Sequence, residues 1–279
     1  MKRETPLIIR LLFYGAIGCG VLVLAAYLWQ RRMVYFPDRA KPSESRVRAL
    51  GLRFWPDSGD AYRGFIGMAA PAGKKGTVVA FHGNAGAAGD RTYYVHALAP
   101  LGYRVVVAEY PGYGGRPGRL GERHFVKDAK ETVRRAYEEF GDPVFLLGES
   151  LGSGVAAAVA ADPSLPVEGG VLITPWDSLP DVRQTLYWHL PIRWLVRDKY
   201  DNIRALQAFS KPVAVALAEG DEIIPQKRSL RLYEALAAPK RLWVFIGAGH
   251  NSWPAGPNEA WWREVMDFVS AQHGKPGPR

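Results

Sequence analysis

Short apolar runs alternate with amphipathic stretches along most of the chain beyond residue 76. Runs rich in valine, leucine and isoleucine predict buried strands at residues 77–81, 103–108, 144–147, 170–174, 213–218 and 242–246. Between them, residues 122–140 and 225–238 have the apolar spacing of helices. Strands that are apolar on both faces must be covered on both faces, so the alternation predicts an α/β fold with a mostly parallel, twisted sheet flanked by helices.

Two further segments follow other patterns. Residues 47–55 and 61–68 have strand character and are separated by a polar Asp-Ser-Gly-Asp turn, which predicts a hairpin. Residues 175–205 interrupt the alternation with aromatic and apolar side chains and no strand pattern. We therefore expect this segment to be an insertion between two strands of the sheet.

The amino-terminal region has one long apolar run. Residues 11–29 carry no charge, and a helix of that length covers roughly 28 Å, about one hydrocarbon core. A cleaved signal peptide has a shorter run and a small-x-small cleavage site, and a buried core helix is the other alternative. We expect a single-pass membrane anchor over residues 7–29. Basic residues flank both ends of the run, so its orientation stays open.

The same patterns divide the chain into regions. After the anchor, residues 30–46 are polar and indicate a linker. We expect the folded domain to cover residues 47–273, with the insertion at residues 175–205, and a flexible tail to follow at residues 274–279. Removal of residues 1–41 should then leave the folded domain complete.

Composition and charge exclude several classes of protein. With 48% hydrophobic and 23% charged residues, the chain is neither wholly disordered nor collagen-like. The formal net charge is +9, but the basic excess lies in the amino-terminal region and the tail, and the folded domain is nearly neutral. We therefore expect no nucleic-acid partner. The single cysteine, Cys19, excludes an intrachain disulfide and a cysteine-based zinc site.

A candidate nucleophile lies in the pentapeptide Gly148-Glu149-Ser150-Leu151-Gly152. This G-x-S-x-G sequence follows a predicted strand and precedes an alanine-rich helix, the context of a nucleophile elbow. The glycines fit a turn that is too tight for side chains. A phosphate-binding turn is the alternative, but neither G-x-G-x-x-G nor a Walker A lysine is present here. We predict that Ser150 is the nucleophile.

An activated serine needs a histidine base. In folds of this type the order along the chain is serine, acid, histidine, and His189, His250 and His273 follow Ser150. His189 lies in the apolar insertion and His273 in the tail, whereas His250 directly follows the strand predicted at residues 242–246. His250 is therefore the predicted base.

The acid that orients this base should follow another strand. Asp221 comes just after the strand predicted at residues 213–218 and before a predicted helix, so we expect it at the same edge of the sheet as Ser150. Glu219 and Glu222 are adjacent alternatives, and Asp177 is a third. Asp221 is preferred because of its position relative to the strand and the helix.

An oxyanion hole needs backbone N–H groups that point at the developing negative charge. Residues 82–86, His-Gly-Asn-Ala-Gly, form a glycine-rich loop after the first strong strand. We predict that the N–H groups of Asn84 and Leu151 form the oxyanion hole, Leu151 being one residue past the nucleophile at a helix start. His82 is expected to hold the shape of the loop.

These motifs together resemble the α/β-hydrolase superfamily, and within it the branch of membrane-anchored serine hydrolases that includes protein depalmitoylases and related bacterial proteins. The matching segments extend over most of the chain, at residues 31–37, 82–86, 110–114, 148–152, 221–225 and 249–251. The resemblance implies an α/β-hydrolase fold, a Ser–Asp–His triad, no cofactor or metal, and a small-molecule or lipidated acyl substrate.

The subclass of hydrolase stays open at this point. Esterases, thioesterases and peptidases share the same triad, and a non-catalytic binding protein could keep the fold. Relatives insert a cap after a core strand, so residues 175–205 should form a small helical cap beside the active site. Trp176, Trp188 and Trp194 in this insertion could line an acyl pocket or form the core of the cap.

Overall fold

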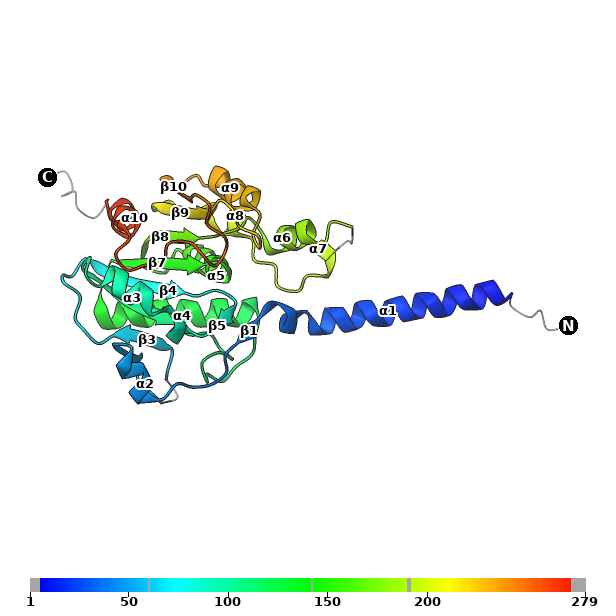
Figure 1. Cartoon of the computed structure of the whole chain (residues 1–279), viewed down its shortest axis with the longest axis horizontal. Helices are drawn as coiled ribbons and strands as arrows, with labels where there is room; N and C mark the ends of the chain where they lie inside the picture. Colours follow the sequence, from blue (N-terminus) through cyan, green and yellow to red (C-terminus); the bar gives the residue numbers. More distant parts are fainter. Residues whose placement is uncertain (1–5, 60, 142, 190–191, 272–279) are drawn as a thin grey trace.

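The computed structural model describes residues 6–59, 61–141, 143–189 and 192–271. His273 and the predicted tail lie outside the described residues. The main sheet contains β2 (Leu52–Trp55), β3 (Gly64–Gly67), β4 (Gly76–Phe81), β6 (Tyr103–Ala108), β7 (Val144–Glu149), β8 (Val167–Ile173), β9 (Val213–Ala218) and β10 (Lys240–Phe245). Their order across the sheet is β10-β9-β8-β7-β4-β6-β3-β2 (Figure 1).

The sheet is mostly parallel, as the sequence predicts. Neighbouring strands from β10 to β6 pair in parallel, and β3 runs antiparallel to both of its neighbours. The carboxyl ends of the parallel strands therefore meet at one edge. Loops that follow β4, β7, β9 and β10 can bring residues far apart in the sequence together there.

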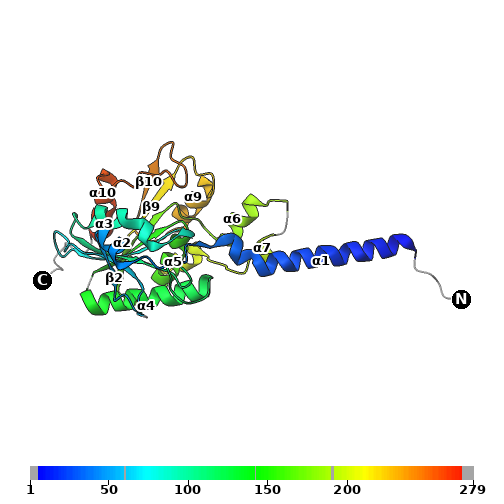
Figure 2. The ribbon, with the colours of Figure 1, turned by 60° about the horizontal axis from the view of Figure 1, so that its bottom comes forward.

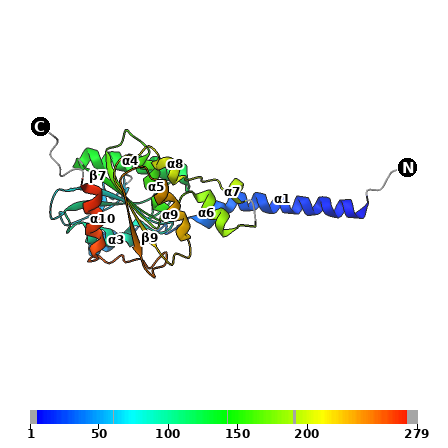
Figure 3. The ribbon, with the colours of Figure 1, turned by 90° about the horizontal axis from the view of Figure 1, so that it is seen from above.

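Helices cover both faces of the sheet (Figure 3). The helices α4 (Glu122–Phe140), α5 (Leu151–Ala160), α8 (Asn202–Leu206) and α9 (Gln226–Ala235) contribute to one hydrophobic cluster. The 3-10 turn η1 (Ala88–Arg91), α2 (Glu44–Ala49), α3 (Thr92–Leu98) and α10 (Ala260–Ser270) contribute to the other. Along β4, Val79 faces the first cluster and Val78 the second. This two-sided burial explains why the strands are apolar at consecutive positions.

The predicted hairpin is correct only in part. Strands β2 and β3 pair antiparallel, with Phe54 opposite Phe65. The first strand does not begin at Val47, however, because this residue lies in α2. The Ser43 side chain caps that helix by accepting a hydrogen bond from the Arg46 N–H at 3.3 Å. A local cap therefore turns the start of the expected strand into helix.

Helix α1 (Leu7–Val34) extends away from the body (Figures 1 and 2). It is long and apolar enough to cross a membrane, and its most apolar stretch is not buried against the rest of the protein. Its large apolar side chains face the surroundings from Leu7 to Met33. Such a surface differs from that of a soluble core helix, which would be covered by the body.

The segment predicted as a linker is part of the folded body. Strand β1 (Phe36–Pro37) pairs in parallel with β5 (Ala85–Gly86), and Tyr35 is only 2% exposed. The Tyr35 hydroxyl donates to Asp198 at 2.8 Å, and Arg31 forms an ion pair with the same carboxylate at 2.8 Å. The polar composition of this segment therefore reflects specific contacts, and the folded body begins well before Val47.

The insertion between β8 and β9 forms α6 (Leu179–Leu186), α7 (Ile192–Leu195) and α8. Helices α6 and α7 lie beside the body-proximal part of α1 (Figures 1 and 3). The Gln30 side chain of α1 donates to the Leu195 carbonyl at 3.1 Å and accepts from the Arg197 N–H at 2.8 Å. The helical insertion is thus attached to the end of α1.

Candidate active site

Ser150 occupies a sharp turn between β7 and α5. Its backbone has φ = 50° and ψ = −113°, a conformation that non-glycine residues rarely adopt. A Cβ atom at Gly152 would overlap the Phe81 carbonyl, and one at Gly148 would overlap the backbone of Gly152. Both glycines are therefore required by close backbone contact. The turn holds the Ser150 side chain at the carboxyl edge of the sheet.

The structure brings Ser150, His250 and Asp221 together. The Nε2 atom of His250 lies 2.9 Å from Ser150 Oγ, and its Nδ1 atom lies 2.8 Å from Asp221 Oδ2. Because an ionised carboxylate can only accept, Nδ1 carries the hydrogen and Nε2 is free to accept from the Ser150 hydroxyl. All three side chains are largely shielded from solvent.

Two backbone N–H groups orient the Asp221 carboxylate. Its Oδ1 atom accepts from Ile223 at 2.9 Å and from Ile224 at 2.6 Å. Oδ2 is thereby left for the imidazole. The loop after β9 thus holds the Asp221 carboxylate against the His250 ring.

The alternative acids have other partners. Glu219 accepts from the Gly247 N–H at 3.0 Å, and Asp177 forms an ion pair with Arg228 at 2.8 Å. Glu222 accepts from the His250 N–H at 3.0 Å, and this hydrogen bond lowers the pKa of the Glu222 carboxyl. Glu222 therefore contacts the backbone of His250 rather than its ring.

His82 has the structural environment that the sequence predicts for it. Its ring is fully buried, with Nδ1 2.8 Å from the Gly83 carbonyl and Nε2 3.0 Å from Glu109 Oε1. Glu109 also accepts from the Ala88 N–H at 3.0 Å, and the Tyr110 hydroxyl donates to the His82 carbonyl at 2.7 Å. The residues after β6 therefore fix the loop after β4.

This loop lies beside the nucleophile. A Cβ atom built on Gly83 would be 3.8 Å from Ser150 Cβ, so the backbone that leads to Asn84 passes close to the serine. The Asn84 carbonyl accepts from the Tyr113 hydroxyl at 2.8 Å. Leu151 is the first residue of α5, and an N–H in the first helical turn has no partner within its helix. Both predicted oxyanion donors therefore belong to segments that adjoin Ser150.

Glu149 is a buried acid that the sequence analysis did not single out. Its carboxylate accepts from the hydroxyl groups of Tyr93, at 2.7 Å, and Tyr94, and lies 3.5 Å from Arg91 Nε. These contacts fix the residue immediately before Ser150. Any residue fits the second position of G-x-S-x-G, so the motif gave no signal for this role.

The three tryptophans lie in two different environments. Trp176 is 2% exposed and packs in the core, with its ring centroid 5.9 Å from that of Tyr200. Trp188 and Trp194 are 80% and 81% exposed. Trp176 therefore belongs to the main core beside α5 rather than to a separate core of the cap. The other two are exposed on the surface of the insertion.

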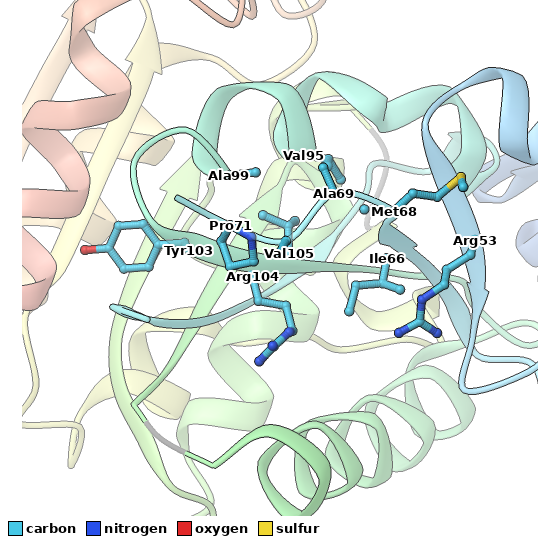
Figure 4. A pocket seen from close by; sticks show the side chains of 12 residues that line it. Arg53, Ile66, Met68, Ala69, Pro71, Val95, Ala99, Tyr103, Arg104 and Val105 are labelled. Carbon is cyan, nitrogen blue, oxygen red and sulfur yellow. The ribbon is translucent and has the colours of Figure 1, made fainter. Parts of the chain in front are cut away.

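A hollow elsewhere on the body contains none of the triad residues. It measures about 150 Å³ and is lined by residues that include Arg53, Met68 and Tyr103 (Figure 4). These residues lie near the amino end of β6, away from the carboxyl edge that carries the triad. Among the described residues, no group of three or more histidine, cysteine or acidic side chains could hold a metal ion.

Comparisons with known proteins agree with this architecture. Residues 72–198 match a family model described as serine aminopeptidase. A Mycobacterium tuberculosis protein of uncharacterised function is 35% identical over 243 residues, covering 84% of this chain and 85% of that protein. The chain belongs to the α/β-hydrolase superfamily and is a hydrolase.

Other α/β-hydrolases are similar over smaller regions or in fold alone. Lysophosphatidylserine lipase ABHD12 of Mus musculus is 29% identical over 191 residues, which cover 62% of this chain and 48% of that lipase. An esterase of Pyrococcus furiosus has a TM-score of 0.65 at 18% identity, covering 86% of this chain and 98% of that structure. A Paleococcus ferrophilus monoacylglycerol lipase has a TM-score of 0.54 at 21% identity, covering 72% and 96%. The two structures support the fold of this α/β-hydrolase.

Proposed function

We propose that this α/β-hydrolase is a serine hydrolase that cleaves acyl esters or thioesters through Ser150, His250 and Asp221. The observation that carries the proposal is the continuous hydrogen-bonded chain from Ser150 Oγ through the His250 ring to Asp221 Oδ2. The strained backbone of Ser150 adds support, because such strain persists only where the surrounding structure enforces it.

In the proposed first step, His250 Nε2 takes the proton of Ser150 as Oγ attacks the acyl carbon. Negative charge develops on the carbonyl oxygen, and the N–H groups of Asn84 and Leu151 stabilise it, aided by the amino end of α5. The imidazolium then protonates the leaving alcohol or thiol, and an acyl-enzyme forms on Ser150. In the second step a water molecule gives a proton to His250 as its oxygen attacks the acyl carbon. The bond between that carbon and Ser150 Oγ then breaks, His250 returns the proton to Oγ, and the acid is released.

We also propose that the reaction takes place at a membrane surface. Helix α1 can span a bilayer, and the exposed Trp188 and Trp194 lie on the insertion that adjoins α1. Tryptophan is enriched where proteins meet the lipid headgroup region. The name of the mammalian relative, a lysophosphatidylserine lipase, favours a lipid ester among the candidate substrates.

A fluorophosphonate probe and a p-nitrophenyl ester test the chemistry together. The wild type should be labelled at Ser150 and should hydrolyse the ester. Ser150→Ala should abolish labelling and lower kcat by roughly 10⁴-fold or more, and Ser150→Ala/His250→Ala should be little worse than either single variant. Undiminished esterase activity in Ser150→Ala would overturn the mechanism.

A serine peptidase is the second candidate, because the matching family model is described as serine aminopeptidase. A panel of esters, thioesters and aminoacyl amides of matched acyl groups separates the two. Turnover of the amides above that of the esters, with the same dependence on Ser150, would favour the peptidase. A protein that the probe does not label and that turns over none of these compounds would be a binding protein with a hydrolase fold.

A further inference from the structure

An apolar groove lies where the body-proximal end of α1 meets the helical insertion. It measures about 200 Å³. Its apolar walls come from α1 on one side and from the α6–α7 region on the other, and include Tyr27, Met33, Val34, Tyr187, Ile192 and Leu195. None of the residues that line it belongs to the triad. The groove is therefore not formed by the catalytic side chains themselves.

Arg183 is the one charged side chain among the described residues that line this groove. No described residue accepts a hydrogen bond from its guanidinium or forms an ion pair with it, whereas Arg31 and Arg228 pair with Asp198 and Asp177. Partial burial lowers the pKa of the Arg183 guanidinium. A shielded cation without an anion is costly. A negatively charged ligand at this position would therefore be stabilised by Arg183.

A second cation lies at the rim of the same groove. Arg197 is exposed, and its guanidinium carbon lies 5.3 Å from the ring centroid of Tyr27, which lines the groove. The apolar walls are continuous with the exposed apolar surface of α1. A ligand that complements the groove must therefore combine an apolar chain with an anionic head, and it must reach the groove from the membrane.

We propose that the groove binds an anionic phospholipid, with an acyl chain against the apolar walls and the phosphate at Arg183. The proposal rests on the membrane location of α1 proposed above. Val34 lines the groove and its carbonyl accepts a hydrogen bond from Asn84 Nδ2 at 2.8 Å. The bound lipid would accordingly stabilise the junction between α1, the insertion and the loop that carries Asn84.

The test uses the full-length protein in nanodiscs of phosphatidylcholine, with and without phosphatidylglycerol. Phosphatidylglycerol should raise the Tm of the wild type by roughly 2–6 °C through preferential binding to the folded state. Arg183→Gln should lose most of this rise. Arg193→Gln is the matched control, since Arg193 is an exposed cation on the same insertion and does not line the groove; it should keep the rise. Native mass spectrometry should show bound phosphatidylglycerol in the wild type and the control only.

Further arms keep the outcome interpretable. Arg183→Lys should retain much of the response if Arg183→Gln acts through charge rather than through misfolding. Glycerol phosphate added to phosphatidylcholine discs should give no rise, because it lacks the acyl chain. The proposal would be overturned if phosphatidylglycerol raised the Tm of the wild type and of Arg183→Gln equally. It would also be overturned if the wild type had the same Tm in discs with and without phosphatidylglycerol. Labelling of Ser150 by the fluorophosphonate probe is measured separately. A failure of the hydrolase mechanism can therefore be distinguished from a failure of lipid binding at Arg183.

Discussion

The Asn84 side chain donates a hydrogen bond to the Val34 carbonyl at 2.8 Å. Val34 is the last residue of α1, and Asn84 carries one of the proposed oxyanion donors. The Phe36 N–H also donates to the Asn84 carbonyl at 2.9 Å. The residue proposed to stabilise the oxyanion is therefore held by two contacts from the end of α1 and the segment that follows it.

Two truncations should behave differently for this reason. Removal of residues 1–29 keeps Val34 and β1, so kcat for a soluble p-nitrophenyl ester should change less than about twofold. Removal of residues 1–41 deletes both contacts to Asn84, and kcat should fall by at least about tenfold, since a misplaced oxyanion donor is costly. Steady-state kinetics of the two purified proteins measure the difference.

Asn84→Ala separates positioning from a general loss of stability. It keeps the backbone N–H but loses the bond to Val34, so kcat should fall several-fold while the Tm changes little. In the 1–41 truncation the same substitution should add almost nothing, because its partner is already gone. Fully additive effects would contradict the coupling.

Glu222 should support His250 through its backbone. Glu222→Ala should lower kcat by roughly two- to tenfold. Glu219 lies in the same loop after β9 and contacts the Gly247 N–H rather than His250. Glu219→Ala should therefore leave kcat nearly unchanged. Equal losses in both variants would mean that the loop as a whole, rather than the His250 contact, is responsible.

The same contact gives a pH dependence of stability. The folded-state pKa of Glu222 is lowered below 4.5, so its stabilising contribution is fully present above that value and disappears as the pH falls through the folded-state pKa. The difference in free energy of unfolding between the wild type and Glu222→Gln should therefore be constant near neutral pH and shrink only in acid. Urea unfolding at several pH values checks this.

Two glycines near the same strands should tolerate alanine very differently. Gly152→Ala places a methyl group on the Phe81 carbonyl, whereas a Cβ at Gly170 meets no atom within 4 Å. We expect Gly152→Ala to lower the free energy of unfolding by about 3 kcal/mol or more, and Gly170→Ala to change it by less than about 1 kcal/mol. Chemical denaturation gives both values, and equal stability of the two variants would contradict the packing of the elbow.

The exposed tryptophans should matter for membrane substrates only. The double variant Trp188→Ser/Trp194→Ser should keep its Tm and its activity on a soluble ester, but lose several-fold activity on a vesicle-embedded ester, because indole rings favour the interface. Met68→Ser is the control, since Met68 is also exposed but lies away from α1. A change in chain-length preference for soluble esters would instead indicate a pocket role.

The positions of Ser150, Asp221 and His250 follow from the sequence because each lies in the turn or loop that follows an apolar strand. Parallel strands place their carboxyl ends at one edge of the sheet. Because these strands are buried on both faces, they are visible in the sequence as continuous apolar runs. The tight turn at Ser150 is likewise encoded locally by its flanking glycines. Local pattern and topology were sufficient for these features.

The tertiary structure alone decided how α1 joins the body and what the insertion does. The contacts of Val34 and Tyr35 pair residues far apart in the chain, with Asn84 and Asp198, and a polar segment with such partners has the same composition as a free linker. Trp176 and Trp188 occur in the same aromatic segment, yet one is buried and the other exposed. Their environments depend on which distant surface covers each side chain, and no periodicity within the segment records that.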